Sequence, residues 1–314
     1  MKKTFVKDLK KDEEVEDIFF ILSRSERKTK EDKPFLHFRL QDKTGIIGGR
    51  VFEGIERYAE IKEKTFALVK GKVDEYRDEL GIIIRELKPV EKGEINQEDF
   101  LRKSEKDLDQ MLKELKDYFP TIDHPFLRQL LESFFSDSAF SEKFKLAPAA
   151  KMAHQAYLGG LLEHTLSVVK ICWAVREIYA TELNLPLLLT GAILHDIGKI
   201  REYEFDITVD ISTEGRLIGH IILGYEMVKE RIEKIEDFPE ELKNKLLHLI
   251  LSSHGEIDYG SPVKPKIPEA IFLYHIDNLD AKMAMVQDLK EETKKEGKDW
   301  SKYHHLLETH IYFG

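Results

Sequence analysis

The sequence predicts a multi-domain protein of α and β structure, with a five-stranded β-barrel at the N-terminus and an all-helical domain behind it. At 314 residues the chain is about twice the length of a typical domain. The first 92 residues hold short alternating segments separated by turn signals, and the later residues show helical spacing. We therefore expect a barrel over residues 1–92, a helical linker or subdomain over 93–146, and a second domain over 147–314.

Five segments of the first part have the pattern of strands. The clearest is residues 35–41, in which Leu36, Phe38 and Leu40 alternate with polar residues, before the turn sequence at 42–45. The five segments are 15–23, 35–41, 46–52, 66–76 and 80–90. Five strands in this order, with a connection after the third, are typical of an OB-type barrel, although another small barrel fits the same spacing.

Helical spacing replaces alternation after Gly93. Asn96 is a candidate N-cap for a first helix that continues to Phe119, and Pro120 and Pro125 separate it from the next. From Ala147 onward the pattern is almost wholly helical, with breaks at glycines and prolines. The stretch after Glu291 is charged and then aromatic, and the pattern assigns it no role.

The net charge of −10 is unevenly distributed. Residues 1–92 hold 22 basic against 20 acidic residues, and the remainder holds 27 against 39. The first part is therefore free to meet a polyanion, whereas the acidic second part suits cations. The single cysteine, Cys172, excludes a disulfide within the chain and fits a reducing compartment. Without an apolar run of about 20 residues we expect a soluble, cytoplasmic protein with no membrane partner.

A histidine–aspartate pair stands at the end of an apolar helix. About one such pair is expected by chance in this composition, so its setting carries the argument. Pro186 can begin a helix, residues 187–194 supply its buried face, and His195-Asp196 follow at its end. Two polar groups that are costly to bury must both find partners there, and a divalent cation satisfies both.

Other candidate ligands share this setting. His164, His254 and Asp277 each lie on an apolar helix face, and His220 opens an apolar run after a loop. Imidazole and carboxylate together favour Mn, Fe, Co or Zn over Ca, and the sequence does not choose among them. A lone histidine is more often structural, and we interpret five others in this way: His248, His275, His304, His305 and His310.

The order His, His-Asp, Asp on successive helices resembles the HD superfamily of metal-dependent phosphohydrolases. Further matches are Gly159-Gly160-Leu161-Leu162-Glu163-His164-Thr165, Leu194-His195-Asp196-Ile197-Gly198-Lys199, Ser253-His254-Gly255-Glu256 and Asp277-Asn278-Leu279-Asp280-Ala281-Lys282. With an OB-like barrel in front, nearly the whole chain resembles the YhaM family of bacterial 3′→5′ exoribonucleases. The resemblance implies release of nucleoside 5′-monophosphates from single-stranded RNA, with single-stranded DNA as an open alternative.

The resemblance also assigns roles by position. It implies that His164, His195, Asp196 and Asp277 bind the core metal, and that His220 and His254 bind a second ion. We expect two divalent transition-metal ions, manganese ahead of iron, cobalt or zinc. As a hypothesis, the ions share Asp196 and generate a hydroxide that attacks the phosphodiester phosphorus, while Lys199 offsets phosphoryl charge. His154 is a candidate contact to that phosphate, with a structural role as the alternative.

The second predicted strand carries a candidate RNA-binding face. Phe35, His37 and Arg39 alternate onto one face, and Arg50 and Phe52 lie on the next strand. Aromatic and cationic groups together can stack bases and follow phosphates. The alternative is that polar residues simply face solvent and the phenylalanines close the barrel.

Two other functions remain open at this stage. The first is an HD phosphohydrolase of nucleotides or of a signalling dinucleotide, which leaves the barrel without a role. The second is a non-catalytic RNA-binding protein, which leaves the complete set of candidate ligands without one. The sequence alone does not give the oligomeric state.

Overall fold

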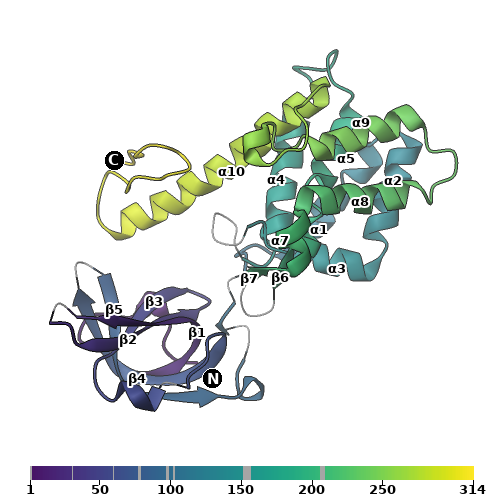
Figure 1. The fold of residues 1–314 in the computed structure, drawn as a ribbon. Helices are drawn as coiled ribbons and strands as arrows, with labels where there is room; N and C mark the ends of the chain where they lie inside the picture. The colour runs from purple at the N-terminus through teal and green to yellow at the C-terminus, as the bar shows by residue number, and fades with distance from the viewer. Residues whose placement is uncertain are drawn as a thin grey trace. The chain divides into compact units, whose positions relative to one another are not determined.

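The computed structural model describes residues 2–29, 31–58, 60–76, 79–96, 99–101, 103–150, 157–205 and 209–314. The chain divides into two compact units, residues 1–102 and residues 103–314 (Figure 1). The division places residues 93–102 with the barrel and residues 103–146 with the later helices, whereas the sequence suggested a separate segment over 93–146.

The first unit is a closed barrel with the strand order β1-β2-β3-β5-β4. Its strands are β1 (Glu14–Lys28), β2 (Pro34–Asp42), β3 (Gly45–Val51), β4 (Thr65–Tyr76) and β5 (Glu79–Val90). Neighbouring strands pair antiparallel except β3 and β5, which run parallel where Gly48 lies beside Gly81. The antiparallel pairing of β1 with β4 closes the barrel. The predicted five-stranded OB-type barrel is confirmed.

Alternation along the strands produces the barrel core. Leu36, Phe38 and Leu40 of β2 are all buried, and the polar residues between them point away from the interior. Phe19 of β1 and Ile82 of β5 are fully buried in the same core. The period-2 pattern read from the sequence therefore sets which side chains face outward.

Residues beyond the last strand still belong to the barrel. The ring of Phe100 packs edge-on against Phe66, with ring centroids 4.8 Å apart. The backbone carbonyl of Asp99 accepts a hydrogen bond from the amide of Lys43, and its carboxylate pairs with the Lys43 ammonium at 3.0 Å. These contacts explain why the unit extends past residue 92.

The second unit is built mainly from helices. They are α1 (Leu108–Lys116), α2 (Pro125–Phe135), α3 (Ser138–Leu146), α4 (Gly160–Ala174), α5 (Leu185–Leu194), α6 (Lys199–Glu202), α7 (Thr213–Ile218), α8 (His220–Ile232), α9 (Glu240–Leu251) and α10 (Pro268–Lys295). The helical domain predicted behind the barrel is confirmed. In Figure 1, α10 is a long helix that runs past the bundle formed by the others.

The start of the first helix differs from the prediction. Helix α1 begins at Leu108, and its N-cap is Asp107, whose carboxylate accepts hydrogen bonds from the amides of Asp109 and Gln110. The cap expected at Asn96 was wrong, because residues 99 and 100 are held against the barrel. Both Asn and Asp are good N-caps, and tertiary contacts decided between them.

A short hairpin within the helical unit was not expected. Strands β6 (Tyr203–Phe205) and β7 (Val209–Ile211) pair antiparallel between α6 and α7. Three-residue strands give too few alternating positions to be recognised in a helical context. The hairpin matters because it places Glu202 and Tyr203 next to the candidate site.

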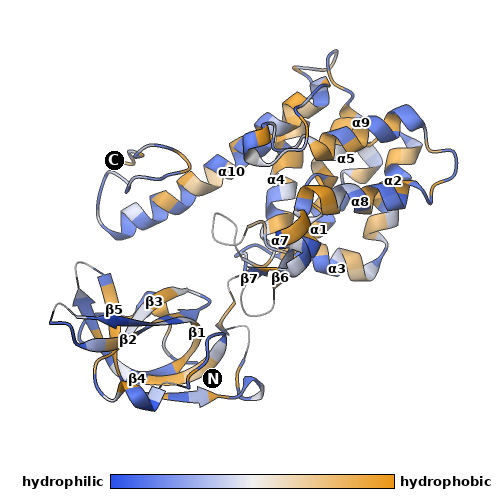
Figure 2. Ribbon diagram, viewed as in Figure 1, coloured by the Kyte–Doolittle hydropathy of each residue, from blue (hydrophilic) through white to orange (hydrophobic). Residues whose placement is uncertain are grey.

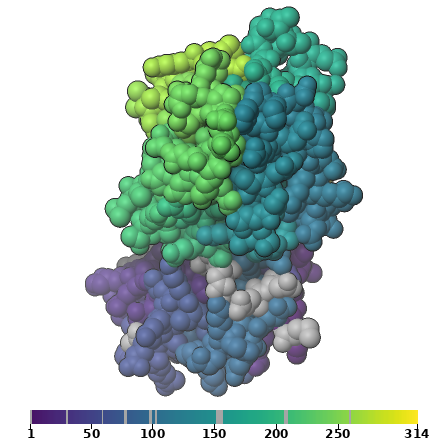
Figure 3. Space-filling view, turned by 90° about the vertical axis from the view of Figure 1, so that its right-hand side faces the viewer, coloured from purple at the N-terminus to yellow at the C-terminus, as the bar shows by residue number. Residues whose placement is uncertain are grey.

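Helix α5 lies at the centre of the hydrophobic core. All its residues from Leu187 to Leu194 are buried, and they pack against α4, α9 and α10. Figure 2 shows hydrophobic residues, drawn in orange, within both units. Figure 3 shows one face of the helical unit, where the blue surface of α1 to α3 meets the green surface of α8 and α9. None of the described helices is both long enough and apolar enough to cross a membrane.

Candidate metal centre

Six polar residues from five parts of the helical unit converge beside α5. His164 comes from α4, His220 from the first position of α8, and Asp277 from α10. His254 follows the end of α9. His195 caps α5 by donating its amide to the carbonyl of Gly191, and Asp196 follows in the turn. His195 is fully buried and Asp196 is 2% exposed, because the apolar helix carries them inward.

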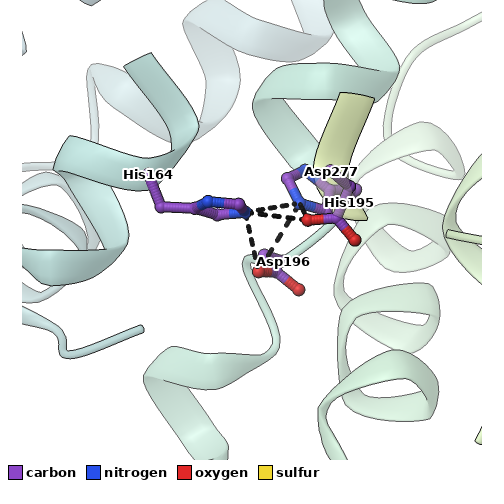
Figure 4. Close-up of side chains that lie close together, drawn as sticks. All are labelled: His164, His195, Asp196 and Asp277. Carbon is purple, nitrogen blue, oxygen red and sulfur yellow. Dashed lines mark hydrogen bonds and ion pairs between the residues drawn. The ribbon is translucent and has the colours of Figure 1, made fainter. Parts of the chain in front are cut away.

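His164, His195, Asp196 and Asp277 form what we call the four-residue cluster (Figure 4). The Nε2 atom of His164 lies 3.0 Å from Oδ1 of Asp277 and 3.3 Å from Nε2 of His195. Nε2 of His195 lies 3.5 Å from Oδ1 of Asp277 and 3.5 Å from Oδ2 of Asp196. One atom from each residue thus points to a common centre, in an arrangement compatible with a divalent metal ion.

Asp196, His220 and His254 form a three-residue cluster that shares Asp196 with the first. Nε2 of His220 lies 3.6 Å from Oδ1 of Asp196 and 3.3 Å from Nε2 of His254. The other oxygen of Asp196, Oδ2, faces the four-residue cluster. The two carboxylate oxygens therefore serve two different clusters, which is the geometry of a bridging ligand.

The outer nitrogen of three imidazoles is held by a hydrogen-bond acceptor. Nδ1 of His164 contacts the carboxylate of Asp280 at 2.7 Å, and Nδ1 of His220 contacts Glu202 at 3.1 Å. Nδ1 of His195 donates to the backbone carbonyl of Ala192 at 2.9 Å. A proton held on Nδ1 leaves the Nε2 lone pair free toward the centre, as in metal-binding histidines generally.

The donor set fits a divalent cation. Oδ1 of Asp196 is buried, and among the described residues it has no hydrogen-bond partner. A buried carboxylate oxygen left in this way is costly unless a cation or a proton compensates it. Four imidazoles and two carboxylates together suit transition metals better than Ca²⁺.

The buried charges are strongly coupled. Burial raises the pKa of Asp196, but the Lys199 ammonium at 2.6 Å and His195 outweigh it and hold the pKa well below its usual range. Burial lowers the pKa of His164, yet the carboxylates of Asp277 and Asp280 raise it to about 10. Burial likewise lowers the pKa of Lys199, and Asp196 raises it above its ordinary value. Burial also raises the pKa of Asp277, but His164 and His195 outweigh it and hold the pKa well below its usual range. Asp196 and Asp277 are therefore ionised, and their field attracts positive charge into the site.

A cavity of about 420 Å³ opens onto both clusters. The basic and acidic residues that line it are His164, His220, His254, Asp277 and Lys199. Tyr203 of the hairpin and Tyr274 of α10 also line it. Its volume lies within the range of about 300–1,000 Å³ that is usual for small-molecule sites.

Two carboxylates of the site were missed by the sequence reading. Asp280 holds His164 and also accepts a hydrogen bond from Ser167, and Glu202 holds His220 through both its backbone amide and its ring. Asp280 is three positions after Asp277 on the same helix, so both lie on one helix face. Looking for a further carboxylate at helical spacing from each candidate ligand would have found it. Glu202 carried no such signal, because the hairpin that positions it was not expected.

Replacing either of these carboxylates should weaken metal binding. We expect Asp280→Asn and Glu202→Gln each to lower affinity for Mn²⁺ by about 10–100-fold, because the imidazole loses its orienting acceptor. The measurement is calorimetric titration of metal-free protein, with the exposed Glu236→Gln as the control. Unchanged affinity in both variants would show that these carboxylates do not act through the histidines.

The predicted RNA-binding residues lie together on the barrel. His37 of β2 is paired with Arg50 of β3, and Phe35 contacts Phe52 with ring centroids 5.3 Å apart. Arg39, two residues along β2 from His37, is exposed. Burial and then the charges of Arg27 and Arg50 lower the pKa of His37. This surface is therefore aromatic and cationic, with His37 itself favouring the neutral form.

His154 lies outside the described residues. Cys172 is buried, and burial raises the pKa of its thiol to about 12, as expected of a structural cysteine. His248 accepts a hydrogen bond from the amide of Lys266, and His310 contacts the carbonyl of Ser301. Neither histidine takes part in the two clusters.

Comparison with known proteins agrees with this architecture. The HD domain family matches residues 161–282, a range that spans both clusters. The 3′-5′ exoribonuclease YhaM of Bacillus subtilis is 31% identical over 90% of this chain and 89% of its own length. The protein of the same name from Shouchella clausii is 33% identical over 90% of this chain and 88% of its own.

Among solved structures, the second OB-fold domain of replication protein A from Methanococcus maripaludis matches 28% of this chain and 95% of that chain. Its TM-score is 0.24 and its sequence identity 20%. The two exoribonucleases from Bacillus subtilis and Shouchella clausii, by contrast, align with 90% of this chain at 31% and 33% identity. The chain therefore belongs to the family of the 3′-5′ exoribonuclease YhaM.

Proposed function

We propose that this protein is a metal-dependent 3′→5′ exoribonuclease that releases nucleoside 5′-monophosphates from single-stranded RNA. The observation that carries the proposal is Asp196, whose two oxygens face two separate clusters of candidate ligands. The similarity to proteins named 3′-5′ exoribonuclease YhaM over nearly the whole chain supports the substrate class.

The candidate ligands divide between two ions. His164, His195, Asp196 and Asp277 would hold the first, and Asp196, His220 and His254 the second. Divalent ions bound here would activate a water molecule and neutralise charge on the phosphoryl oxygens. Of the metals that suit these donors, we propose manganese ahead of iron, cobalt or zinc.

The remaining groups of the site orient and stabilise. Asp280 and Glu202 hold Nδ1 of His164 and His220, so that both rings present Nε2 to the clusters. The Lys199 ammonium is 13% exposed and lines the cavity, where it can pair with a phosphoryl oxygen. Because Lys199 is held by Asp196, its charge is already in place before the phosphate enters, which lowers the cost of reorganisation.

We assign the barrel to RNA upstream of the cleaved bond. Phe35 and Phe52 offer faces on which bases can stack, while Arg39 and Arg50 can follow the phosphates. Single-stranded DNA remains a second substrate to be tested. We place the activity in the cytoplasm, where the thiol of Cys172 stays reduced.

The proposal is tested with end-labelled RNA. Metal-free protein should be inactive, and added Mn²⁺ should restore stepwise shortening of a single-stranded RNA with a free 3′ end. A 3′-phosphorylated or 3′-blocked copy of the same RNA should be degraded at least about 100-fold more slowly, since an exonuclease must seat the terminal nucleotide. Equal cleavage of both RNAs would contradict the 3′→5′ direction.

A second candidate is hydrolysis of free nucleotides or a dinucleotide. Two features of the cavity favour this function. Its volume of about 420 Å³ suits one nucleotide, and its described lining comes entirely from the helical unit. Turnover of nucleotides by a protein that leaves RNA intact would select this alternative. RNA binding without any turnover would select a non-catalytic role.

A further inference from the structure

The cavity at the metal centre is also lined by apolar residues that are not candidate metal ligands. Beyond Asp277 it is lined by Asn278, Ala281 and Met285 of α10 and by Leu306 of the C-terminal segment. Met285 and Leu306 belong to neither hydrophobic core among the described residues. Both line the same cavity as the candidate metal ligands His164, His220, His254 and Asp277.

Helix α10 contributes five of the residues that line the cavity. Tyr274, Asp277, Asn278, Ala281 and Met285 all line it, and their spacing places them along one stripe of the helix. At a rise of about 1.5 Å per residue, Met285 lies about 12 Å along α10 from Asp277. A phosphate at the clusters would thus have the rest of its nucleotide extending along α10 toward Met285.

The segment that carries Leu306 is an ordered element. Trp300 bridges Tyr312, and His304 bridges Thr309, so that Leu306 lies in the turn between paired residues. Ser301 is buried and reinforces the pairing, because its hydroxyl accepts a hydrogen bond from the amide of Ile311 at 2.8 Å. Leu306 itself is 64% exposed although it lines the cavity.

We infer that Met285 and Leu306 form a subsite for the base of the terminal nucleotide, so that the C-terminal segment 296–314 takes part in substrate binding. This inference rests on the proposed function, since it requires the phosphate of an RNA end at the metal centre. An apolar leucine and a polarizable methionine suit the face of an aromatic base. Every base has such a face, so the subsite favours a base without selecting one sequence.

Leu306 differs from the other exposed apolar residues in its position. Leu217 on α7 is 80% exposed, more than Leu306, yet it does not line the cavity. The exposure of Leu306 by itself therefore does not indicate a binding role. Its place in the same cavity as His164, Lys199 and Asp277 links it to the substrate.

The experiment compares two RNAs that differ only in their last nucleotide. One ends in an ordinary nucleotide, and the other ends in an abasic ribose with the same phosphate. We expect the wild-type protein to release the abasic unit with a kcat/KM about tenfold lower, the loss expected for one apolar contact. The double variant Met285→Ala/Leu306→Ala should lose about tenfold on ordinary RNA and retain the wild-type rate on the abasic end. Leu217→Ala should match the wild type on both.

The outcomes separate the inference from the function on which it rests. An equal loss on both RNAs in the double variant would assign the segment a purely structural role and overturn the subsite. No loss on either RNA would also overturn it. Failure of the wild-type protein to shorten either RNA would instead refute the proposed function. Hydrolysis of the abasic end serves as the internal check that the double variant is folded and holds its metal.

Discussion

Asp196→Asn should reduce kcat/KM on single-stranded RNA by on the order of 10³-fold or more while leaving RNA affinity nearly unchanged. Asp196 is the residue that both clusters share, and an amide in its place removes the charge that faces them. It also leaves the Lys199 ammonium, now 2.6 Å from a carboxylate oxygen, without its anionic partner. RNA affinity depends on the barrel and should survive.

The measurement combines rates with metal content. Single-turnover degradation of labelled RNA gives the chemical step, and elemental analysis of the purified variant should show less bound metal than the wild type. Asp123→Asn is the matched control, because Asp123 is exposed and does not belong to either cluster. A kcat/KM of Asp196→Asn within about tenfold of the wild-type value would contradict the metal mechanism.

Gly198→Ala should destabilise the helical unit by about 3 kcal/mol or more and should weaken metal binding as well. A Cβ atom at this position would lie 1.9 Å from the carbonyl oxygen of His220 and 2.5 Å from the amide nitrogen of Gly224. Both atoms are backbone, so no rotamer change can relieve the overlap. Helix α8 must move away, and His220 would then leave Asp196.

Thermal unfolding and calorimetric metal titration measure the two effects separately. Gly93→Ala is the control, since a Cβ there meets nothing within 4 Å. We expect the control to keep the wild-type Tm, and Gly198→Ala to lose several degrees. A Gly198→Ala protein with normal Tm and normal metal affinity would mean that the turn and α8 are not packed as described.

The barrel was predictable because alternation alone sets which side chains of β2 are inside. Leu36, Phe38 and Leu40 are buried as the pattern required, and the connection after the third strand implied the OB order. The last contacts of the barrel were not predictable. Asp99 and Phe100 follow the strands in a stretch that reads as helical, and only their pairing with Lys43 and Phe66 places them.

The candidate site was predictable to the extent that polar residues stood on apolar helices. His164, His195, Asp196 and Asp277 were grouped on this ground, and the structure brings them within one cluster. Glu202 could not be found, because it ends α6 directly before a hairpin whose three-residue strands have too short a pattern to be recognised. Asp280 was quoted only as part of a motif, and its contact with His164 required the packing of α10 on α4.

The C-terminal segment had no recognisable pattern in the sequence. Its pairing relies on isolated bridges, such as Trp300 with Tyr312, and on the buried Ser301. Neither feature follows a period of 2 or 3.6 residues. Only the three-dimensional course of the chain shows that Leu306 reaches the cavity.

The candidate ligands are spread along the polypeptide from His164 on α4 to Asp277 on the last helix. During synthesis His164 and His195 leave the ribosome before Asp277 does. A nascent chain therefore has no complete four-residue cluster until α10 has emerged. Metal uptake is then coupled to completion of the chain rather than to its early folding. A chain that ends before α10 would lack Asp277 and with it a complete four-residue cluster.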